Sequence, residues 1–339
     1  MLKIGLLGAG HLGKIHLKCI QLAAEDYELV GFYDPDEAAA RLAEEQHGAR
    51  RWESLDALLD AVDVVDIVTP TTTHFEVATR AIRKGKHIFI EKPLAHTLKE
   101  AESLLQLCRE YGVKAQVGHV ERFNPALLAL GKMPLAPMFI EAHRLAVFNP
   151  RGTDVSVILD LMIHDLDIVL SLVRSKVAFV SASGVPVVSD TADICNAHIE
   201  FENGCVANLT ASRISLKQMR KLRLFQQDAY ISLDFLEKEA QVVRLFDNES
   251  DSPSTDNLLE LETPRGKKFI HLSMPQIEPI NAIKMELEAF ADSIRNNKRP
   301  VVSIEDGYDA LKLAHQIIDD MERRKQALPR SPDMGLRPQ

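Results

Sequence analysis

The sequence contains little cysteine and no cysteine motif. Cys19, Cys108, Cys195 and Cys205 are scattered over 339 residues, with no CxxC pair and no cluster of cysteine and histidine residues. This pattern argues against a disulfide framework and against a zinc site, and it predicts core thiols in a reducing compartment. The opening stretch MLKIGLLGAG predicts a strand and a glycine turn rather than a signal peptide. We therefore expect a cytoplasmic protein.

Long apolar runs and an excess of positive charge are also missing. No apolar run approaches the roughly 20 residues that a membrane helix needs. The formal net charge of −9 argues against nucleic acid or an anionic membrane as the main partner, although a local basic patch can still bind a small anion. What is present is a hydrophobic fraction of 46% and a charged fraction of 26%, which are typical of a globular protein long enough for two domains.

The first part of the chain alternates short apolar runs with amphipathic helical stretches. This rhythm is typical of βαβ units, and the nearly continuous apolar runs indicate a parallel sheet that is covered on both faces. We therefore predict a doubly wound α/β domain of the Rossmann type over residues 1–122. Its expected strands lie at residues 3–8, 28–34, 65–70, 87–93 and 114–119.

The rhythm changes after Arg122. A helix is expected over residues 156–173, and Asn203-Gly204 lies between two alternating runs, which is a strong hairpin signal. The region 123–326 therefore predicts an open, mostly antiparallel sheet domain, whose last two helices can pack back on the first domain. Residues 247–268 are expected to form a polar loop and residues 327–339 a mobile tail. The β-like runs are 176–188, 193–212, 220–235 and 239–246, and the last two helices are expected at 279–296 and 305–325.

The glycine turn at the start of the chain carries the clearest ligand signal. It has the G-x-G-x-x-G spacing after a predicted strand and before a predicted helix, and Asp34 follows at the end of the next strand. Such a turn holds a pyrophosphate at a helix N-terminus, and the acidic residue binds the ribose hydroxyls. No arginine or lysine directly follows Asp34, which favours NAD, although Arg41 and the Arg50-Arg51 pair leave NADP open. The predicted cofactor residues of this part are Gly8, Gly10, His11, Leu12, Gly13 and Asp34.

Charged residues inside the apolar helix 156–173 call for an explanation, because buried charge is costly unless it is paired. Asp160 and His164 are four residues apart, so a regular helix places them on one face. We expect that face to line an active site; the alternative is a hydrogen-bonded core histidine with a paired aspartate. A metal site is a weaker interpretation, because no further ligand set is evident. Asp165 and Asp167 are expected to point elsewhere, as solvated or capping residues.

Four short motifs occur in order along the chain: GAGHLG at 8–13, TPTTTH at 69–74, EKPLA at 91–95 and DLMIHDLD at 160–167. Together with the stretch EPINAIKMELEAFADSIRNNKRPVVSIEDGYDALKLA near the end, this ordered set resembles the glucose–fructose oxidoreductase / inositol dehydrogenase (Gfo/Idh/MocA) family. The resemblance implies hydride transfer between a sugar hydroxyl and a nicotinamide. One departure is DVSVILD, where family members often carry glycines. The implied catalytic residues are Lys92, Asp160 and His164, and the implied nicotinamide-side pocket is formed by Thr69, Pro70, His74, Glu91 and Lys92.

The segments GHVERFNP and RGTDVSVILD are similar to the branch of this family that oxidises the 3-hydroxyl of nucleotide-linked N-acetyl amino sugars, such as UDP-N-acetylglucosamine. A free polyol of the inositol type is the alternative substrate, and a regulator that binds a dinucleotide without catalysis is the alternative class. We also expect a homodimer or homotetramer. The candidate substrate-binding residues near the predicted cleft are Arg122, Asn124, Arg144 and Arg151.

Overall fold

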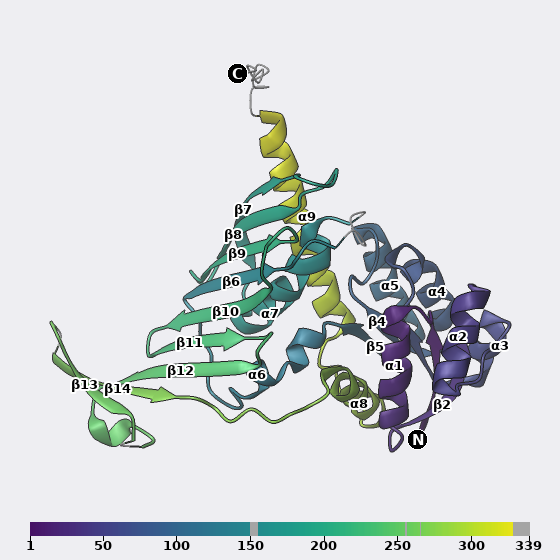
Figure 1. The fold of residues 1–339 in the computed structure, drawn as a ribbon, viewed down its shortest axis with the longest axis horizontal. Helices are drawn as coiled ribbons and strands as arrows, with labels where there is room; N and C mark the ends of the chain where they lie inside the picture. The colour runs from purple at the N-terminus through teal and green to yellow at the C-terminus, as the bar shows by residue number, and fades with distance from the viewer. Residues whose placement is uncertain (150–154, 255, 265, 328–339) are drawn as a thin grey trace.

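The first domain is built on a five-stranded parallel sheet with the strand order β2-β1-β3-β4-β5 (Figure 1). The structure is a computed structural model and describes residues 1–149, 155–254, 256–264 and 266–327. The five predicted strands are confirmed as β1 (Leu2–Leu7), β2 (Tyr27–Tyr33), β3 (Val64–Ile67), β4 (His87–Glu91) and β5 (Ala115–Gly118). The helices that connect them are α1 (His11–Leu22), α2 (Glu37–His47), α3 (Leu55–Ala61), α4 (Thr71–Arg83) and α5 (Leu98–Tyr111).

Two separate apolar layers cover the two faces of this sheet. One layer contains residues of α1 and α2, and it is completed by Leu287 and Phe290 of α8 (Ala282–Arg295) from near the end of the chain. The Tyr27 hydroxyl donates a hydrogen bond to the Leu287 carbonyl at 2.8 Å, which ties α8 to the start of β2. The other layer contains residues of α3, α4 and α5. The C-terminal part of the chain therefore packs back on the first sheet.

The second sheet has nine strands in the order β13-β14-β12-β11-β10-β6-β9-β8-β7, and all its pairs are antiparallel except β6 with β9. This confirms the expected open, mostly antiparallel sheet. One face packs against α7 (Ile163–Val173) and α9 (Ile304–Ala327) (Figure 1). No described helix combines the length and the hydropathy needed to span a bilayer. The strands are β6 (Phe139–Leu145), β7 (Val177–Val185), β8 (Ile194–Phe201), β9 (Val206–Ser212), β10 (Met219–Gln226), β11 (Ala229–Asp234), β12 (Glu239–Phe246), β13 (Leu258–Thr263) and β14 (Gly266–Ser273).

The prediction of a polar loop at 247–268 was wrong. Leu258–Thr263 and Gly266–Ser273 form the antiparallel pair β13–β14, which lies at the outer edge of the sheet (Figure 1). The physical reason is the alternation in LLELET, where leucine and glutamate residues take opposite faces of a strand. The surrounding serines, asparagine and charged residues hide this pattern when composition alone is considered.

The helix expected over residues 156–173 is not regular throughout. Its first part is a π-turn, Ile158–Met162, and the α-helical part α7 begins at Ile163. A π-turn shifts the backbone hydrogen bonds by one residue and recurs at functional sites. The simple spacing argument that placed Asp160 and His164 on one α-helical face therefore does not hold, because Asp160 lies in the π-turn.

Candidate active site

The glycine turn has the geometry that its sequence predicts. Gly8 has a φ of +92°, and a Cβ atom there would lie 2.7 Å from the Val68 carbonyl oxygen. A Cβ at Gly13 would lie 1.9 Å from the Gly8 carbonyl oxygen, so α1 can pack this closely only with glycine. Gly10 instead faces open space and forms the N-terminus of α1 without a side-chain cap. The backbone N–H groups of the first turn are therefore accessible to an anion.

Asp34 lies directly beside this turn. Its carboxylate accepts hydrogen bonds from the Ala9 N–H at 2.6 Å and from the Asp36 N–H at 2.8 Å. The side chain is thus held at the carboxyl end of β2, partly exposed, next to the N-terminus of α1. His11 and Leu12 lie in the first turn of α1 and are exposed.

His74 joins the loops that follow β3 and β4. Its ring nitrogens lie 2.9 Å from the Thr69 carbonyl oxygen and 3.0 Å from the Pro93 carbonyl oxygen, and the residue is only 1% exposed. Burial lowers the pKa of His74. The neutral imidazole therefore lies between the two loops and donates its single N–H to one of these carbonyl oxygens, whereas Thr69 and Pro70 are the more accessible members of this segment.

Lys92 reaches from the first domain to the π-turn of the second. Its Nζ donates a hydrogen bond to the Asp160 backbone carbonyl at 2.8 Å and lies 3.7 Å from Asp160 Oδ1. The Lys92 and Asp160 side chains are 20% and 43% exposed, so the contact is open to a ligand. The Lys92–Pro93 peptide bond is cis.

His164 completes this group from the first turn of α7. Burial, followed by the charges of Lys92 and Arg144, lowers its pKa well below the ordinary value, so the imidazole is neutral at pH 7. Its Nδ1 is buried and has no hydrogen-bond partner within the described ranges. The remaining nitrogen, Nε2, is the one that a ligand can reach.

A second imidazole, His119, was missed by the sequence analysis. It directly follows β5, is 1% exposed, and its ring lies edge-on to that of His164 with 6.4 Å between the centroids. Neither of its nitrogens has a partner among the residues that the structure describes. The rule that singled out Lys92, a polar residue just beyond the carboxyl end of a parallel strand, applies equally to His119.

The basic side chains predicted to bind substrate are held in buried ion pairs. Arg144 donates to Asp165 at 2.8 and 3.0 Å and to Glu121 at 2.9 Å, and Arg122 donates to Asp167 at 2.5 and 2.8 Å. Asp165 and Asp167 are 3% and 1% exposed, so the expectation that they are solvated or capping was wrong. Removing one partner of such a pair leaves a buried charge, which is strongly destabilising.

These ion pairs explain why α7 can carry so many carboxylates within an apolar helix. They fix the helix against η1 (Val120–Phe123) and β6, and so they fix the position of His164. Asn124 has a comparable structural role, because its amide donates to Glu121 at 2.9 Å and to the Phe235 carbonyl at 3.0 Å. The remaining predicted substrate residue, Arg151, lies outside the described residues, as do residues 328–339 of the predicted tail, whereas Ala327 is the last residue of α9.

A buried network of one histidine and two carboxylates adjoins the backbone of Lys92. His16 Nδ1 is 2.9 Å from Asp66 Oδ2, and His16 Nε2 is 3.2 Å from Glu91 Oε1. Glu91 Oε2 accepts the Lys92 backbone N–H at 3.2 Å, which links the network to the candidate site. Burial opposes protonation of His16, but Asp66 and Glu91 outweigh it and raise its pKa well above the ordinary value. Glu286 of α8 is fully buried, and burial together with Glu91 raises its pKa well above the usual range.

This network makes the stability of the protein depend on pH. Because the folded-state pKa of Glu286 is raised, its favourable contribution is present below the unfolded pKa and is lost as the pH rises through the folded pKa. We expect Glu286→Gln, which mimics the neutral acid, to make the decline of the unfolding free energy with rising pH less steep. Urea unfolding of both proteins over a series of pH values measures this. Parallel pH profiles for the two proteins would contradict the assignment of a protonated Glu286.

Comparison with known families matches both parts of the chain. Residues 2–119 match a family described as an oxidoreductase family with an NAD-binding Rossmann fold, and residues 141–231 match the GFO/IDH/MocA C-terminal domain. These ranges contain the glycine turn, Asp34, Lys92, Asp160 and His164.

Individual relatives agree with the family match. The chain is 44% identical over 237 residues to UDP-N-acetylglucosamine 3-dehydrogenase of Acidithiobacillus ferrooxidans, which is 69% of this chain and 74% of the relative. A solved structure of that enzyme superposes with a TM-score of 0.83 at 34% identity, over 95% of this chain and 98% of the other. The NAD⁺-dependent scyllo-inositol 2-dehydrogenase of Bacillus subtilis is 27% identical over 324 residues, or 89% of this chain and 88% of the relative. The two domains, their order and their motifs show that the chain belongs to the Gfo/Idh/MocA family of NAD-binding oxidoreductases.

Proposed function

We propose that the protein oxidises the 3-hydroxyl of a UDP-linked N-acetyl amino sugar, with NAD as the hydride acceptor. The observation that carries the proposal is the contact of Lys92 with Asp160 between the two domains, with His164 near enough for the Lys92 charge to lower the pKa of its imidazole. An ammonium group and a neutral imidazole at one place can bind an alcohol oxygen and remove its proton.

The residues present fit an NAD molecule. The open backbone at Gly10 and the uncapped N-terminus of α1 suit the pyrophosphate, and Asp34 suits the hydroxyls of the adenosine ribose while repelling a 2′-phosphate. Thr69, Pro70 and the Glu91–Lys92 segment would line the nicotinamide side. When bound, NAD supplies the acceptor for the hydride that leaves the substrate carbon.

A substitution at Asp34 tests the cofactor part of this proposal. We expect Asp34→Ser to raise the KM for NAD by about 10- to 100-fold, because hydrogen bonds to a charged group contribute about 1.5–3 kcal/mol. The KM for NADP should rise less or fall, since the repelling carboxylate is gone. Asp34→Asn keeps an acceptor oxygen and should lie between the two. Steady-state kinetics with both cofactors measures the change, and an unaltered NAD/NADP preference would argue against the role of Asp34.

The chain's own groups would perform the proton chemistry. His164 Nε2 accepts the hydroxyl proton. The lowered pKa of His164 keeps the imidazole neutral and therefore able to accept this proton. Lys92 Nζ donates a hydrogen bond to the same oxygen and stabilises its developing negative charge. Asp160 positions the ammonium group, and the ion pairs of Arg122 and Arg144 keep α7 in place.

The nature of the sugar is proposed from the relatives. UDP-N-acetylglucosamine 3-dehydrogenase is similar over most of the chain and superposes well, whereas the inositol dehydrogenase is less similar in sequence. The product would be a 3-keto nucleotide sugar. The four buried free cysteines suit a reducing compartment, so we place the reaction in the cytoplasm. We also propose that the protein acts as a homodimer or homotetramer.

A substrate panel tests the proposed function. The purified protein is incubated with NAD and with UDP-N-acetylglucosamine, free N-acetylglucosamine, scyllo-inositol or myo-inositol, and NADH is followed by its absorbance. We expect turnover with the nucleotide sugar and a kcat/KM at least about tenfold lower for the free sugar and the polyols. Preferred turnover of an inositol would contradict the proposed substrate, and NAD binding without turnover on any sugar would indicate a regulator.

A further inference from the structure

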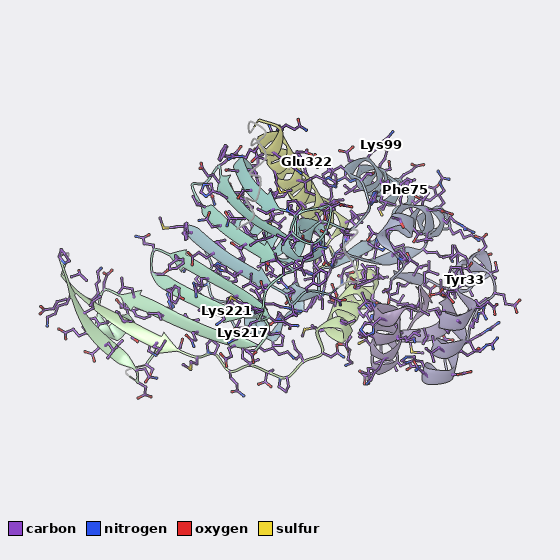
Figure 2. All side chains as sticks on the ribbon, turned by 45° about the horizontal axis from the view of Figure 1, so that its top comes forward. Tyr33, Phe75, Lys99, Lys217, Lys221 and Glu322 are labelled. Atoms are coloured by element: carbon purple, nitrogen blue, oxygen red, sulfur yellow. The ribbon has the colours of Figure 1, made fainter. Side chains whose placement is uncertain are left out.

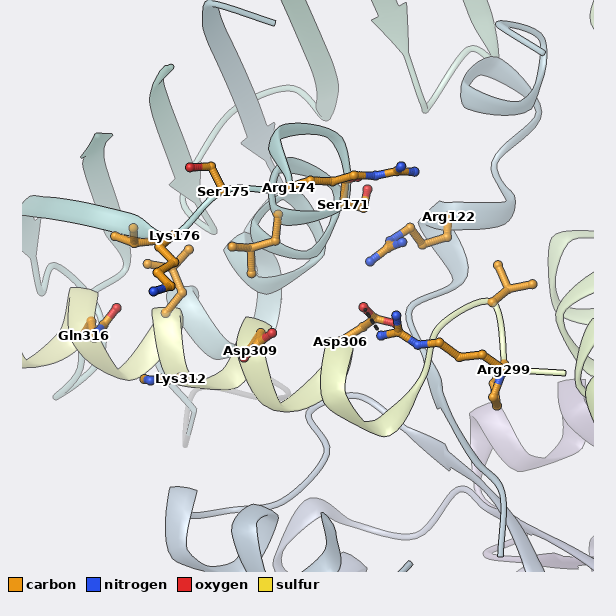
Figure 3. Close-up of a pocket in the computed structure, with 15 residues that line it drawn as sticks. Arg122, Ser171, Arg174, Ser175, Lys176, Arg299, Asp306, Asp309, Lys312 and Gln316 are labelled. Atoms are coloured by element: carbon orange, nitrogen blue, oxygen red, sulfur yellow. Dashed lines mark hydrogen bonds and ion pairs between the residues drawn. The ribbon is translucent and has the colours of Figure 1, made fainter. Parts of the chain in front are cut away.

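A cavity of about 900 Å³ lies apart from the residues of the proposed reaction (Figure 3). It is bordered by η1, by the C-terminal end of α7 and the start of β7, and by the segment that leads into α9 together with the first turns of that helix. His164 is at the opposite end of α7. The lining contains five cationic side chains, Arg122, Arg174, Lys176, Arg299 and Lys312.

Only part of this positive charge is neutralised within the protein. Arg122 pairs with Asp167, and Arg299 pairs with Asp306 at 3.1 Å. Arg174, Lys176 and Lys312 have no ion-pair partner in the described part of the chain. The lining contains one carboxylate without an ion-pair partner among the described residues, Asp309, and burial raises the pKa of Asp309 although Lys312 opposes this rise. In a chain with a net charge of −9, this is a local excess of positive charge.

The backbone conformation of Arg174 and its hydrogen bond fix the position of its positive charge at the cavity. Arg174 ends α7 in the left-handed region, with a φ of 50°, a conformation that favours glycine. Its Nε donates to the Ser171 carbonyl at 3.1 Å, so the guanidinium is folded back along the end of the helix. Figure 3 shows it on the same side as Arg122, with Arg299 and Asp306 across the cavity and with Lys176 and Lys312 near Gln316. Guanidinium groups present planar pairs of N–H donors that match phosphate oxygens.

We propose that this cavity binds a phosphate-bearing anion at a site separate from the glycine turn and from Lys92. The unpaired Arg174, Lys176 and Lys312 supply the attraction, and Gln316 adds a neutral donor. The site suits a diphosphate, either free or as part of a nucleotide, because the cavity is lined by three cations without an ion-pair partner in the described part of the chain, and a diphosphate carries several negative charges.

Isothermal titration of the NAD-saturated protein with inorganic pyrophosphate tests the proposal, since bound NAD occupies the glycine turn. The test variant is Arg174→Gln/Lys312→Gln. The matched control is Lys99→Gln/Lys132→Gln, which also removes two positive charges but at exposed positions outside the cavity; Figure 2 shows Lys99 on α5. We expect saturable binding by the wild type and the control, and at least tenfold weaker binding by the test variant. Thermal unfolding and NAD affinity check that the variant is folded.

Titration with UDP distinguishes the two sources of the diphosphate. Tighter binding of UDP than of pyrophosphate, lost in the test variant, would identify a nucleotide as the ligand, whereas UDP binding unaffected in that variant would leave free pyrophosphate as the ligand. Lys176→Gln provides a second variant, with a partial loss expected, if the double variant does not fold. Absence of saturable pyrophosphate binding, or equal weakening in the test and control variants, would overturn the proposal.

Discussion

Replacing His164 by alanine is expected to lower kcat by about 10²–10⁴-fold, the range that a positioned general base contributes. Alanine has no group that can accept the hydroxyl proton, and the neighbouring imidazole, His119, is itself buried and packs edge-on against the ring of His164. The glycine turn is untouched, so the dissociation constant for NAD should remain within about twofold. Steady-state kinetics and cofactor titration measure the two quantities.

His47→Ala is a matched control, since His47 lies in the last turn of α2, away from the proposed site. Its kcat should equal that of the wild type. The pH profile gives a second check: the lowered pKa of His164 places the acidic limb of kcat/KM below pH 6.5, because the imidazole loses its function only when it is protonated. A His164→Ala enzyme that retains most of the wild-type kcat would exclude the imidazole as the base.

Lys92→Met is expected to lower kcat by about 10²–10³-fold, as the loss of one donor to a developing oxyanion does. Methionine keeps much of the apolar side chain, so the packing beside the π-turn is preserved while the donor to the Asp160 carbonyl is lost. Comparison of kcat, of the KM for the sugar and of NAD affinity separates this effect from a general loss of binding.

The control for this substitution is Lys18→Met, on the exposed side of α1. It removes the same charge without touching Asp160, and its kinetics should match the wild type. If Lys92→Met changes only the KM for the sugar and leaves kcat unaltered, then Lys92 binds the substrate equally in the ground and transition states and does not stabilise the developing charge.

Local sequence patterns were sufficient to predict the parts of the fold that are determined by neighbouring residues in the sequence. The parallel strands are short continuous apolar runs, and the turn at Gly8, Gly10 and Gly13 needs glycine for steric reasons that spacing already expresses. The Asn203-Gly204 hairpin is confirmed between β8 and β9. The pairing of Lys92 with Asp160 came from the family resemblance, because no periodicity connects residues in different domains.

Features that depend on tertiary contacts could not be predicted in this way. Whether Asp165 and Asp167 are solvated depends on Arg144 and Arg122, which come from β6 and η1 and reach them only after folding. The network of His16, Asp66 and Glu91, together with the nearby Glu286 that these charges affect, likewise brings four elements together. The sequence pattern of the amphipathic helix α8 does not reveal that its Glu286 is buried. The π-turn before α7 has no sequence signal that periodicity can detect.

Transfer of a labelled hydrogen tests most directly whether Lys92, Asp160 and His164 act on a sugar carbon beside a nicotinamide. UDP-N-acetylglucosamine carrying deuterium at C3 is incubated with the protein and NAD, and the NADH formed is analysed by mass spectrometry and NMR. We predict that the deuterium appears at C4 of the nicotinamide ring in the wild type and that labelled NADH forms about 10²–10⁴-fold more slowly with His164→Ala. Unlabelled NADH, or deuterium retained in the sugar while NADH accumulates, would contradict oxidation at this carbon.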